Sequence, residues 1–139
     1  MDTKDIGELS EATVLTKLKS LGFTVSTPFG DNARYDLIFD DENHLYKVQV
    51  KTGKLKERGV VTFNTASNCH NSEENYQKGY AEKDIDLFIV YCPQNEQIYA
   101  VDVEDAPKSA MSLRVEEPEN GQTKGINMAD EFRLIERFN

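Results

Sequence analysis

Two runs in the first half of the chain alternate apolar and polar side chains, and a short polar turn joins them. The runs are residues 34–40 and 44–51. A period of two is typical of paired, half-buried strands, so the pattern predicts a β-hairpin. Residues two apart in a strand share a face, so one face of the second strand should carry Lys47, Gln49 and Lys51.

A helical pattern precedes this hairpin. Apolar residues recur at helical spacing over residues 4–21, and Gly22 is a stop signal. At about 100° per residue, Glu11 lies between Leu15 and Leu18 near the middle of the apolar stripe. A carboxylate there is costly unless it is paired or binds a cation. The alternative is that Glu11 reaches water from the end of the helix.

The remaining pattern predicts short strands around a central apolar run. A breaker-rich loop follows the first of these strands, part of 72–80 can be helical, and the last 30 residues resemble loops with short elements. Together these elements predict an α/β sandwich with a mixed sheet, built as a single domain over residues 1–139. The further strands are predicted at Phe23–Ser26, Gly59–Asn64, Ile85–Tyr91 and Gln97–Val103.

Charge is unevenly distributed along the chain. Lys and Arg number 16 against 25 Asp and Glu, a formal net charge of -9, which on average repels nucleic acid. Residues 1–69 are nearly balanced, with 10 acids and 9 bases, so most of the excess lies in the second half. A basic strip within 47–58 can contact phosphates, or can simply be solvated. Its bases are Lys47, Lys51, Lys54, Lys56 and Arg58.

The two cysteines and the absence of long apolar runs bear on location. Cys69 and Cys92 are far apart and lack metal-ligand spacing. The sequence contains neither a signal peptide nor an apolar run long enough to span a membrane. We therefore expect a cytoplasmic protein without a membrane partner.

The hairpin carries the groups that phosphodiester hydrolysis needs. Asp36 interrupts an apolar run and is a candidate ligand for Mg²⁺, which prefers hard oxygen atoms. Gln49 offers an amide oxygen and Val50 a backbone carbonyl as further ligands. Lys51 can orient or deprotonate an attacking water, or stabilise the developing negative charge. Alternatively, Asp36, Gln49 and Lys51 are ordinary polar residues on the wet face of a sheet.

The combined spacing is more specific than its parts and resembles the PD-(D/E)xK nuclease superfamily. The resemblance is carried by Gly7-x3-Glu11, Leu18-x3-Gly22-Phe23, Asp36 and Gln49-x-Lys51. A narrower similarity is to the group I intron-associated members of that superfamily. It is carried by Pro28-x-Gly30-Asp31-Asn32-x2-Tyr35-Asp36-Leu37-Ile38 and by Val48-Gln49-Val50-Lys51-Thr52.

This resemblance implies a restriction-endonuclease-like α-β-β-β-α-β core with a mixed sheet. It also implies Mg²⁺-dependent, homing-type cleavage of double-stranded DNA by a homodimer or homotetramer, with Mn²⁺ as an alternative ion. By motif position, Glu11 is the helix carboxylate, Asp36 the metal-binding aspartate and Lys51 the catalytic lysine. Gln49 stands where the wider superfamily has an acid, so the site has two negative charges and should hold Mg²⁺ more weakly.

Residues around the hairpin are candidates for contact with DNA. Arg34 and Lys47 can hold phosphates beside the scissile one. In the turn beyond the second strand, three bases can enter a groove, and further along two polar side chains can reach base edges, although each can also be an ordinary solvated residue. These five are Lys54, Lys56, Arg58, Ser67 and Asn68.

Two alternatives to a homing enzyme remain open. The first is a resolvase for branched DNA (a Holliday-junction resolvase) of the same fold, because the helix motif around Glu11 is shared with that branch of the superfamily. The second is a non-catalytic acidic module that mimics DNA, which the net charge of -9 favours. A mimic does not need a lysine next to an aspartate, and this counts against it.

Overall fold

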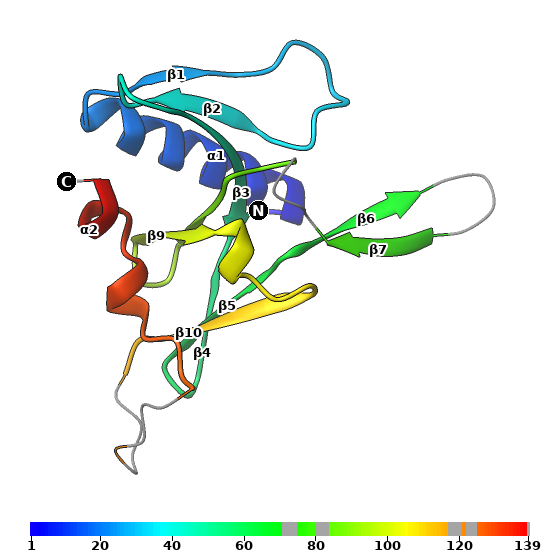
Figure 1. Ribbon diagram of the computed structural model, residues 1–139. Helices are drawn as coiled ribbons and strands as arrows, with labels where there is room; N and C mark the ends of the chain where they lie inside the picture. The colour runs from blue at the N-terminus through cyan, green and yellow to red at the C-terminus, as the bar shows by residue number, and fades with distance from the viewer. Residues whose placement is uncertain (71–74, 80–83, 117–120, 122–124, 139) are drawn as a thin grey trace.

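A computed structural model gives the arrangement of most of the chain (Figure 1). Its elements, in order, are α1 (Thr3–Ser20), β1 (Thr24–Ser26), β2 (Leu37–Asp40), β3 (Leu45–Thr52), β4 (Lys54–Lys56), β5 (Val60–Asn64), β6 (Ala66–His70), β7 (Asn75–Gly79), β8 (Leu87–Cys92), β9 (Gln97–Asp102), η1 (Val103–Asp105), β10 (Ala110–Arg114), η2 (Ala129–Phe132) and α2 (Leu134–Phe138). The structure describes residues 1–70, 75–79, 84–116, 121 and 125–138, and only the backbone within 67–70 and 75–79. Within those ranges, no helix combines the length and apolar character needed to cross a lipid bilayer.

Helix α1 forms where the sequence predicts it. The Asp2 carboxylate accepts a hydrogen bond from the Asp5 backbone N–H at 2.9 Å, which satisfies a free donor of the first turn. The helix ends before Gly22, whose φ of 91° is a left-handed conformation that glycine adopts without strain. The end of the helix therefore agrees with the stop signal at Gly22, and both ends lie within one residue of the predicted bounds.

The main sheet has five strands in the order β1-β2-β3-β8-β9. Strands β3 and β8 run parallel, and every other neighbouring pair is antiparallel. The sheet is therefore mixed, as predicted. Strand β8 is central and its side chains are almost all buried, which explains the nearly continuous apolar run.

Each face of this sheet packs on a different layer. Helices α1 and α2 cover one face, where Val14 and Leu18 meet Val48 and Val50 of β3. A second sheet of order β10-β5-β4 covers the other face, with Val61 among its contacts to β8 and β9. Figure 1 shows α1 across the main sheet and the hairpin β6–β7 extending away from both layers. The α/β sandwich that the sequence predicts is confirmed.

Two local predictions were wrong. Residues 75–79, within the stretch predicted to be partly helical, form strand β7, and the rest of 72–80 lies outside the described residues. Lys54 and Lys56, expected in a turn, lie in β4, which pairs with β5. Pairing with a neighbouring strand decides such short segments, because their own conformational preference is weak. In the described residues, strands β4–β7 occupy the connection from β3 to β8, where the α-β-β-β-α-β order implies a helix.

Candidate active site

The predicted site lies at an edge that the sheet leaves open. Strand β2 pairs with β3 only as far as Leu37 opposite Val48, whereas β3 continues to Thr52. From Gln49 onward, β3 has β8 beside it, and no strand in the described part of the chain pairs with it on the β2 side. Its backbone donors on that side therefore need other partners.

Asp36 fills this gap. It immediately precedes β2, and its backbone N–H donates to the Val48 carbonyl at 2.8 Å. One oxygen of its carboxylate, Oδ2, accepts the Val50 N–H at 2.8 Å. This bond fixes the carboxylate against β3 and leaves Oδ1 for other partners. Asp36, the acid that interrupts the apolar run, therefore bonds to β3 just beyond the last residue pair of β2 and β3.

Glu11 of α1 meets Asp36 at this edge. The two carboxyl groups lie close enough together for each to influence the pKa of the other. Burial raises the pKa of Glu11, and the Asp36 charge raises it further. Burial also raises the pKa of Asp36, although the Val50 N–H, Glu11 and Lys51 act in the opposite direction. The structure thus brings together two acids that lie on different elements.

The position of Glu11 on the helix differs slightly from the prediction. The buried stripe of α1 is Ser10, Val14 and Leu18, so its centre is Val14. Glu11 lies about 60° from that centre at 100° per residue. It is therefore at the border of the stripe, half-buried, where a side chain can reach both Asp36 and solvent.

Lys51 approaches the acids from β3. Its ammonium Nζ donates to the Ala66 carbonyl at 3.3 Å, at the start of β6. Burial lowers the pKa of Lys51, the Asp36 carboxylate raises it, and Arg34 lowers it further. Gln49 is half-buried and, by alternation, on the same face of β3 as Lys51. Glu11 and Lys51 therefore each interact with Asp36, so the structure brings three of the predicted groups together.

A hollow of about 290 Å³ opens in front of the two acids. Both carboxylates line it, together with the loop between β1 and β2. That loop is the breaker-rich segment in the sequence, and its Gly30 has a φ of 94°. The loop residues that line the hollow are Thr27, Pro28, Gly30, Asp31, Ala33 and Tyr35.

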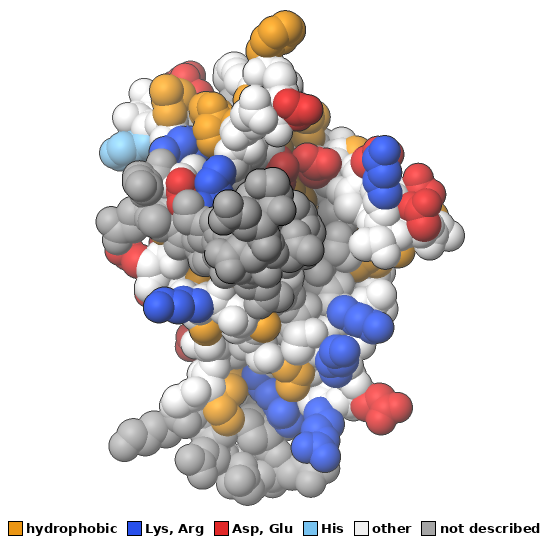
Figure 2. All heavy atoms as spheres, turned by 90° about the vertical axis from the view of Figure 1, so that its right-hand side faces the viewer, with side chains coloured by type: hydrophobic (Ala, Val, Ile, Leu, Met, Phe, Trp, Pro, Cys, Tyr) orange, Lys and Arg blue, Asp and Glu red, His pale blue; other side chains and the backbone are white. Residues whose placement is uncertain are grey.

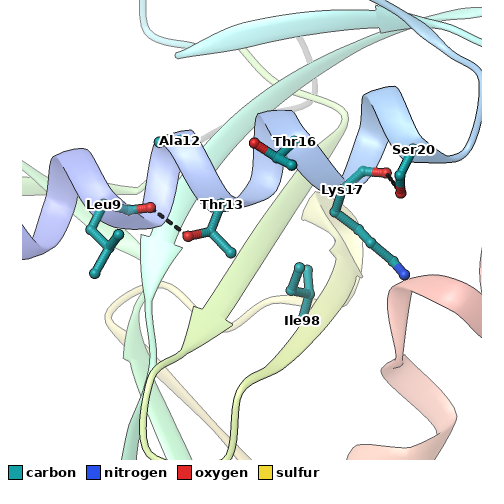
Figure 3. A pocket seen from close by; sticks show the side chains of 7 residues that line it. All are labelled: Leu9, Ala12, Thr13, Thr16, Lys17, Ser20 and Ile98. Atoms are coloured by element: carbon teal, nitrogen blue, oxygen red, sulfur yellow. Dashed lines mark hydrogen bonds between the residues drawn. The ribbon is translucent and has the colours of Figure 1, made fainter.

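A larger hollow of about 500 Å³ lies along α1 and β9 (Figure 3). Lys17 is the only charged residue among those that line it, and no carboxylate does. The hydroxyls of Thr13 and Ser20 donate to backbone carbonyls one turn earlier in α1, at 2.7 and 2.6 Å. This hollow therefore offers no carboxylate ligand for a metal ion.

The donor set at the smaller hollow fits a divalent cation. No three His, Cys, Asp or Glu side chains gather in the described ranges, so carboxylates alone do not form a metal site there. Glu11 and Asp36 supply two; burial is the main cause that raises the pKa of each, and the Asp36 charge adds to the shift of Glu11. A cation bound beside them would favour their charged forms. The Gln49 amide and the Val50 carbonyl are neutral oxygen donors on the adjoining strand.

Arg34 is held near the site by an acid that the sequence analysis missed. Its guanidinium Nη1 lies 3.2 Å from Oδ2 of Asp84. The side chains are 25% and 14% exposed, so the pair is partly shielded from water. Arg34 also lies close enough to Lys51 to lower its pKa. No sequence signal could link Arg34 to Asp84, because the two are 50 residues apart.

The other predicted DNA contacts lie at varied distances from the acids. Lys47 is four residues before Lys51 on the same face of β3, roughly 13 Å away along the strand. Lys54, Lys56 and Arg58 are exposed on β4 and the turn after it. Figure 2 shows the face of the molecule that lies on the right-hand side of Figure 1. Lys and Arg side chains gather mostly in the lower half of this face. The side chains of Ser67 and Asn68 on β6 lie outside the described part.

Comparison with known proteins assigns the chain to a family. A model of the PD-(D/E)XK endonucleases matches residues 1–135. Among solved structures, a bacterial homing endonuclease, I-Ssp6803I, superposes with a TM-score of 0.81 at 23% sequence identity, over 99% of this chain and 92% of that chain. No curated protein matches significantly. Since the family model covers nearly the whole sequence, the chain belongs to the PD-(D/E)XK endonuclease family.

Proposed function

We propose that this endonuclease hydrolyses phosphodiester bonds of double-stranded DNA with Mg²⁺, at a specific site, as a homing enzyme. Membership of the PD-(D/E)XK endonuclease family supports DNA as the substrate. The observation that carries the rest is the meeting of Glu11, Asp36 and Lys51 at the open edge of β3. Two acids beside a desolvated amine, facing a hollow, are the groups that metal-assisted phosphoryl chemistry uses.

Four groups would hold the ion in this proposal. They are the carboxylates of Glu11 and Asp36, the amide oxygen of Gln49 and the backbone carbonyl of Val50. When bound, a divalent cation neutralises charge on the phosphate and activates water at neutral pH. Because Gln49 is uncharged, the scissile phosphate would have to contribute part of the negative charge around the ion.

Lys51 would act directly on the reacting groups. Its lowered pKa makes proton transfer at Nζ easier than in an exposed lysine. The Ala66 carbonyl holds the ammonium on the site side of β3. From there Lys51 would orient the attacking water or stabilise charge on a phosphate oxygen. Arg34, anchored by Asp84, would bind a neighbouring phosphate.

We also propose that a single domain over residues 1–139 holds one complete site and works as a homodimer or homotetramer. Duplex DNA presents two strands of opposite polarity, and each protomer would carry one set of these residues. A two-fold pair is the simplest assembly that addresses both strands. Sedimentation velocity with and without duplex DNA measures the assembly.

A cleavage assay tests the proposed function. Supercoiled plasmid and fragmented genomic DNA are incubated with excess protein and Mg²⁺, and cut ends are sequenced. The test variants are Asp36→Asn and Lys51→Met. The matched controls, which make equivalent changes at exposed positions of η1 and α1, are Glu104→Gln and Lys19→Met.

We expect the wild type and both controls to cut at recurrent sequences, and the two test variants to lose at least about 100-fold in rate. Equal cleavage by Asp36→Asn would overturn the proposed site. A four-way DNA junction is assayed alongside the duplex. Preferential cutting of the junction would replace the homing function with that of a resolvase, and wild-type protein that cuts neither substrate would favour the acidic mimic.

A further inference from the structure

Ser10 is a polar residue on the buried stripe of α1. It is 1% exposed, and the other members of the stripe, Val14 and Leu18, are apolar. Its hydroxyl lies 2.6 Å from the hydroxyl of Thr52 at the end of β3, a hydrogen bond that links residues 42 positions apart. A buried hydroxyl is costly without such a partner, so this pair stabilises one arrangement of helix and strand.

The positions of these two residues give the bond a particular importance. Ser10 immediately precedes Glu11, and Thr52 immediately follows Lys51. The bond therefore joins the backbone segment that carries the helix carboxylate to the segment that carries the lysine. The other members of the buried stripe of α1 make apolar contacts with β3, and apolar contacts have little directional preference.

The two acids cannot provide this link by themselves. Both groups are acids, so their charges repel and do not hold the two segments together. The hydroxyl pair is neutral and directly joins α1 to the end of β3, so it can hold the helix against the strand.

We propose that the Ser10–Thr52 hydrogen bond is a positioning contact that sets the distance of Glu11 from Asp36 and from the Gln49–Lys51 segment. The proposal rests on the function proposed above. Side-chain atoms lie roughly 6 Å from a helix axis, so a rotation of α1 by about 10° moves the Glu11 carboxylate by about 1 Å. A misplacement of that size can lower a catalytic rate by about 100-fold.

The test compares variants that remove or keep the hydroxyl pair. Ser10→Ala and Thr52→Val remove one hydroxyl each, and Thr52→Ser keeps it. Tyr99→Phe is the matched control, because it removes a hydrogen bond of a buried residue, the 3.1 Å bond from Asn95 Nδ2, on a strand that does not carry the site residues. For each protein we would measure kcat and KM on cleavable DNA, Mg²⁺ affinity by calorimetry without DNA, and Tm.

We expect Ser10→Ala and Thr52→Val to lower kcat by about 10- to 100-fold and to weaken Mg²⁺ binding by at least fivefold, with KM for DNA little changed. Thr52→Ser should restore both values, and Tyr99→Phe should lower only Tm. In the double variant Ser10→Ala/Thr52→Val the losses should not add, because both changes break one contact.

Two results separate this inference from the proposed function. If Ser10→Ala and Thr52→Val change only Tm, as Tyr99→Phe does, the positioning role is overturned even when Asp36→Asn is inactive. If Asp36→Asn cuts DNA as fast as the wild type, the proposed function itself fails. Should Thr52→Val not fold, the comparison of Ser10→Ala with Thr52→Ser gives the same decision.

Discussion

Replacing Glu11 with glutamine should stabilise the protein in the absence of divalent cations. Glu11 and Asp36 lie close together, and burial raises the pKa of each, so each is destabilised in its charged form. A glutamine amide can still donate a hydrogen bond to the Asp36 carboxylate, but it carries no charge. The substitution therefore removes the repulsion and retains the contact.

Coulomb's law bounds the size of the effect. Two like charges about 4 Å apart repel by about 1 kcal/mol in water and about 4 kcal/mol where the effective dielectric constant is about 20. Since Glu11 is only half-buried, we take the lower part of that range, about 1–2 kcal/mol. In a domain of this size, 1 kcal/mol shifts Tm by about 3 °C. Glu11→Gln should therefore raise Tm by about 3–6 °C at pH 7.5 in EDTA.

The pH dependence has a definite sign. The ordinary pKa values of Glu11 and Asp36 are 4.5 and 3.8, and both are raised in the folded protein. Between those values and the folded ones, the native state binds more protons than the unfolded chain, so stability falls as pH rises. The wild type should therefore lose stability from about pH 4 upward until both acids are ionised, and Glu11→Gln should show a smaller loss.

Thermal unfolding measures both effects. Tm is recorded from pH 4 to 8 in EDTA, and again with Mg²⁺. The matched control is Glu8→Gln, an exposed glutamate one turn earlier on α1, which should change Tm by less than about 2 °C. A tenfold excess of Mg²⁺ over its Kd should stabilise the wild type by about 1.4 kcal/mol, and Glu11→Gln by less. The reasoning is refuted if Glu11→Gln has the same Tm and pH profile as the wild type in EDTA.

Other residues give predictions that are independent of the acid pair. Gln49→Glu adds a third negative charge to the candidate metal site and should tighten Mg²⁺ binding while changing the ratio of Mg²⁺- to Mn²⁺-supported cleavage; identical metal profiles would count against Gln49 as a ligand. Gly53→Ala should destabilise the fold by about 1–3 kcal/mol, because its added Cβ would lie 2.7 and 3.0 Å from two valine methyl groups. Gly7→Ala on α1, where nothing lies within 4 Å, should instead stabilise it by about 0.5–1 kcal/mol, and urea unfolding of both variants tests this contrast. Replacing Lys54 and Lys56 with glutamine should reduce the slope of log affinity against log salt by up to about 2, measured by fluorescence anisotropy on duplex DNA; an unchanged slope would mean that β4 does not contact phosphates.

Local patterns in the sequence determined much of the scaffold. The apolar recurrence and Gly22 predicted α1, and alternation predicted the hairpin of β2 and β3. The apolar run containing Asp86 predicted β8 as a central strand. These features could be read from the sequence because helix and strand periods depend on neighbouring residues, and because burial of one face imposes a regular spacing. The segment 72–80 lacks such a regular spacing, and the prediction for β7 was therefore wrong.

The sequence by itself also identified the individual residues of the candidate site, through an acid inside an apolar run and a Gln49-x-Lys51 pair on one strand face. Only the tertiary structure decided how they meet. The parallel pairing of β3 with β8, the open edge beyond Val48, and the contacts of Asp36 with Glu11 and of Ser10 with Thr52 all join segments far apart in the chain. Such contacts depend on how whole faces of helices and sheets pack together, and no local period of side chains encodes that packing.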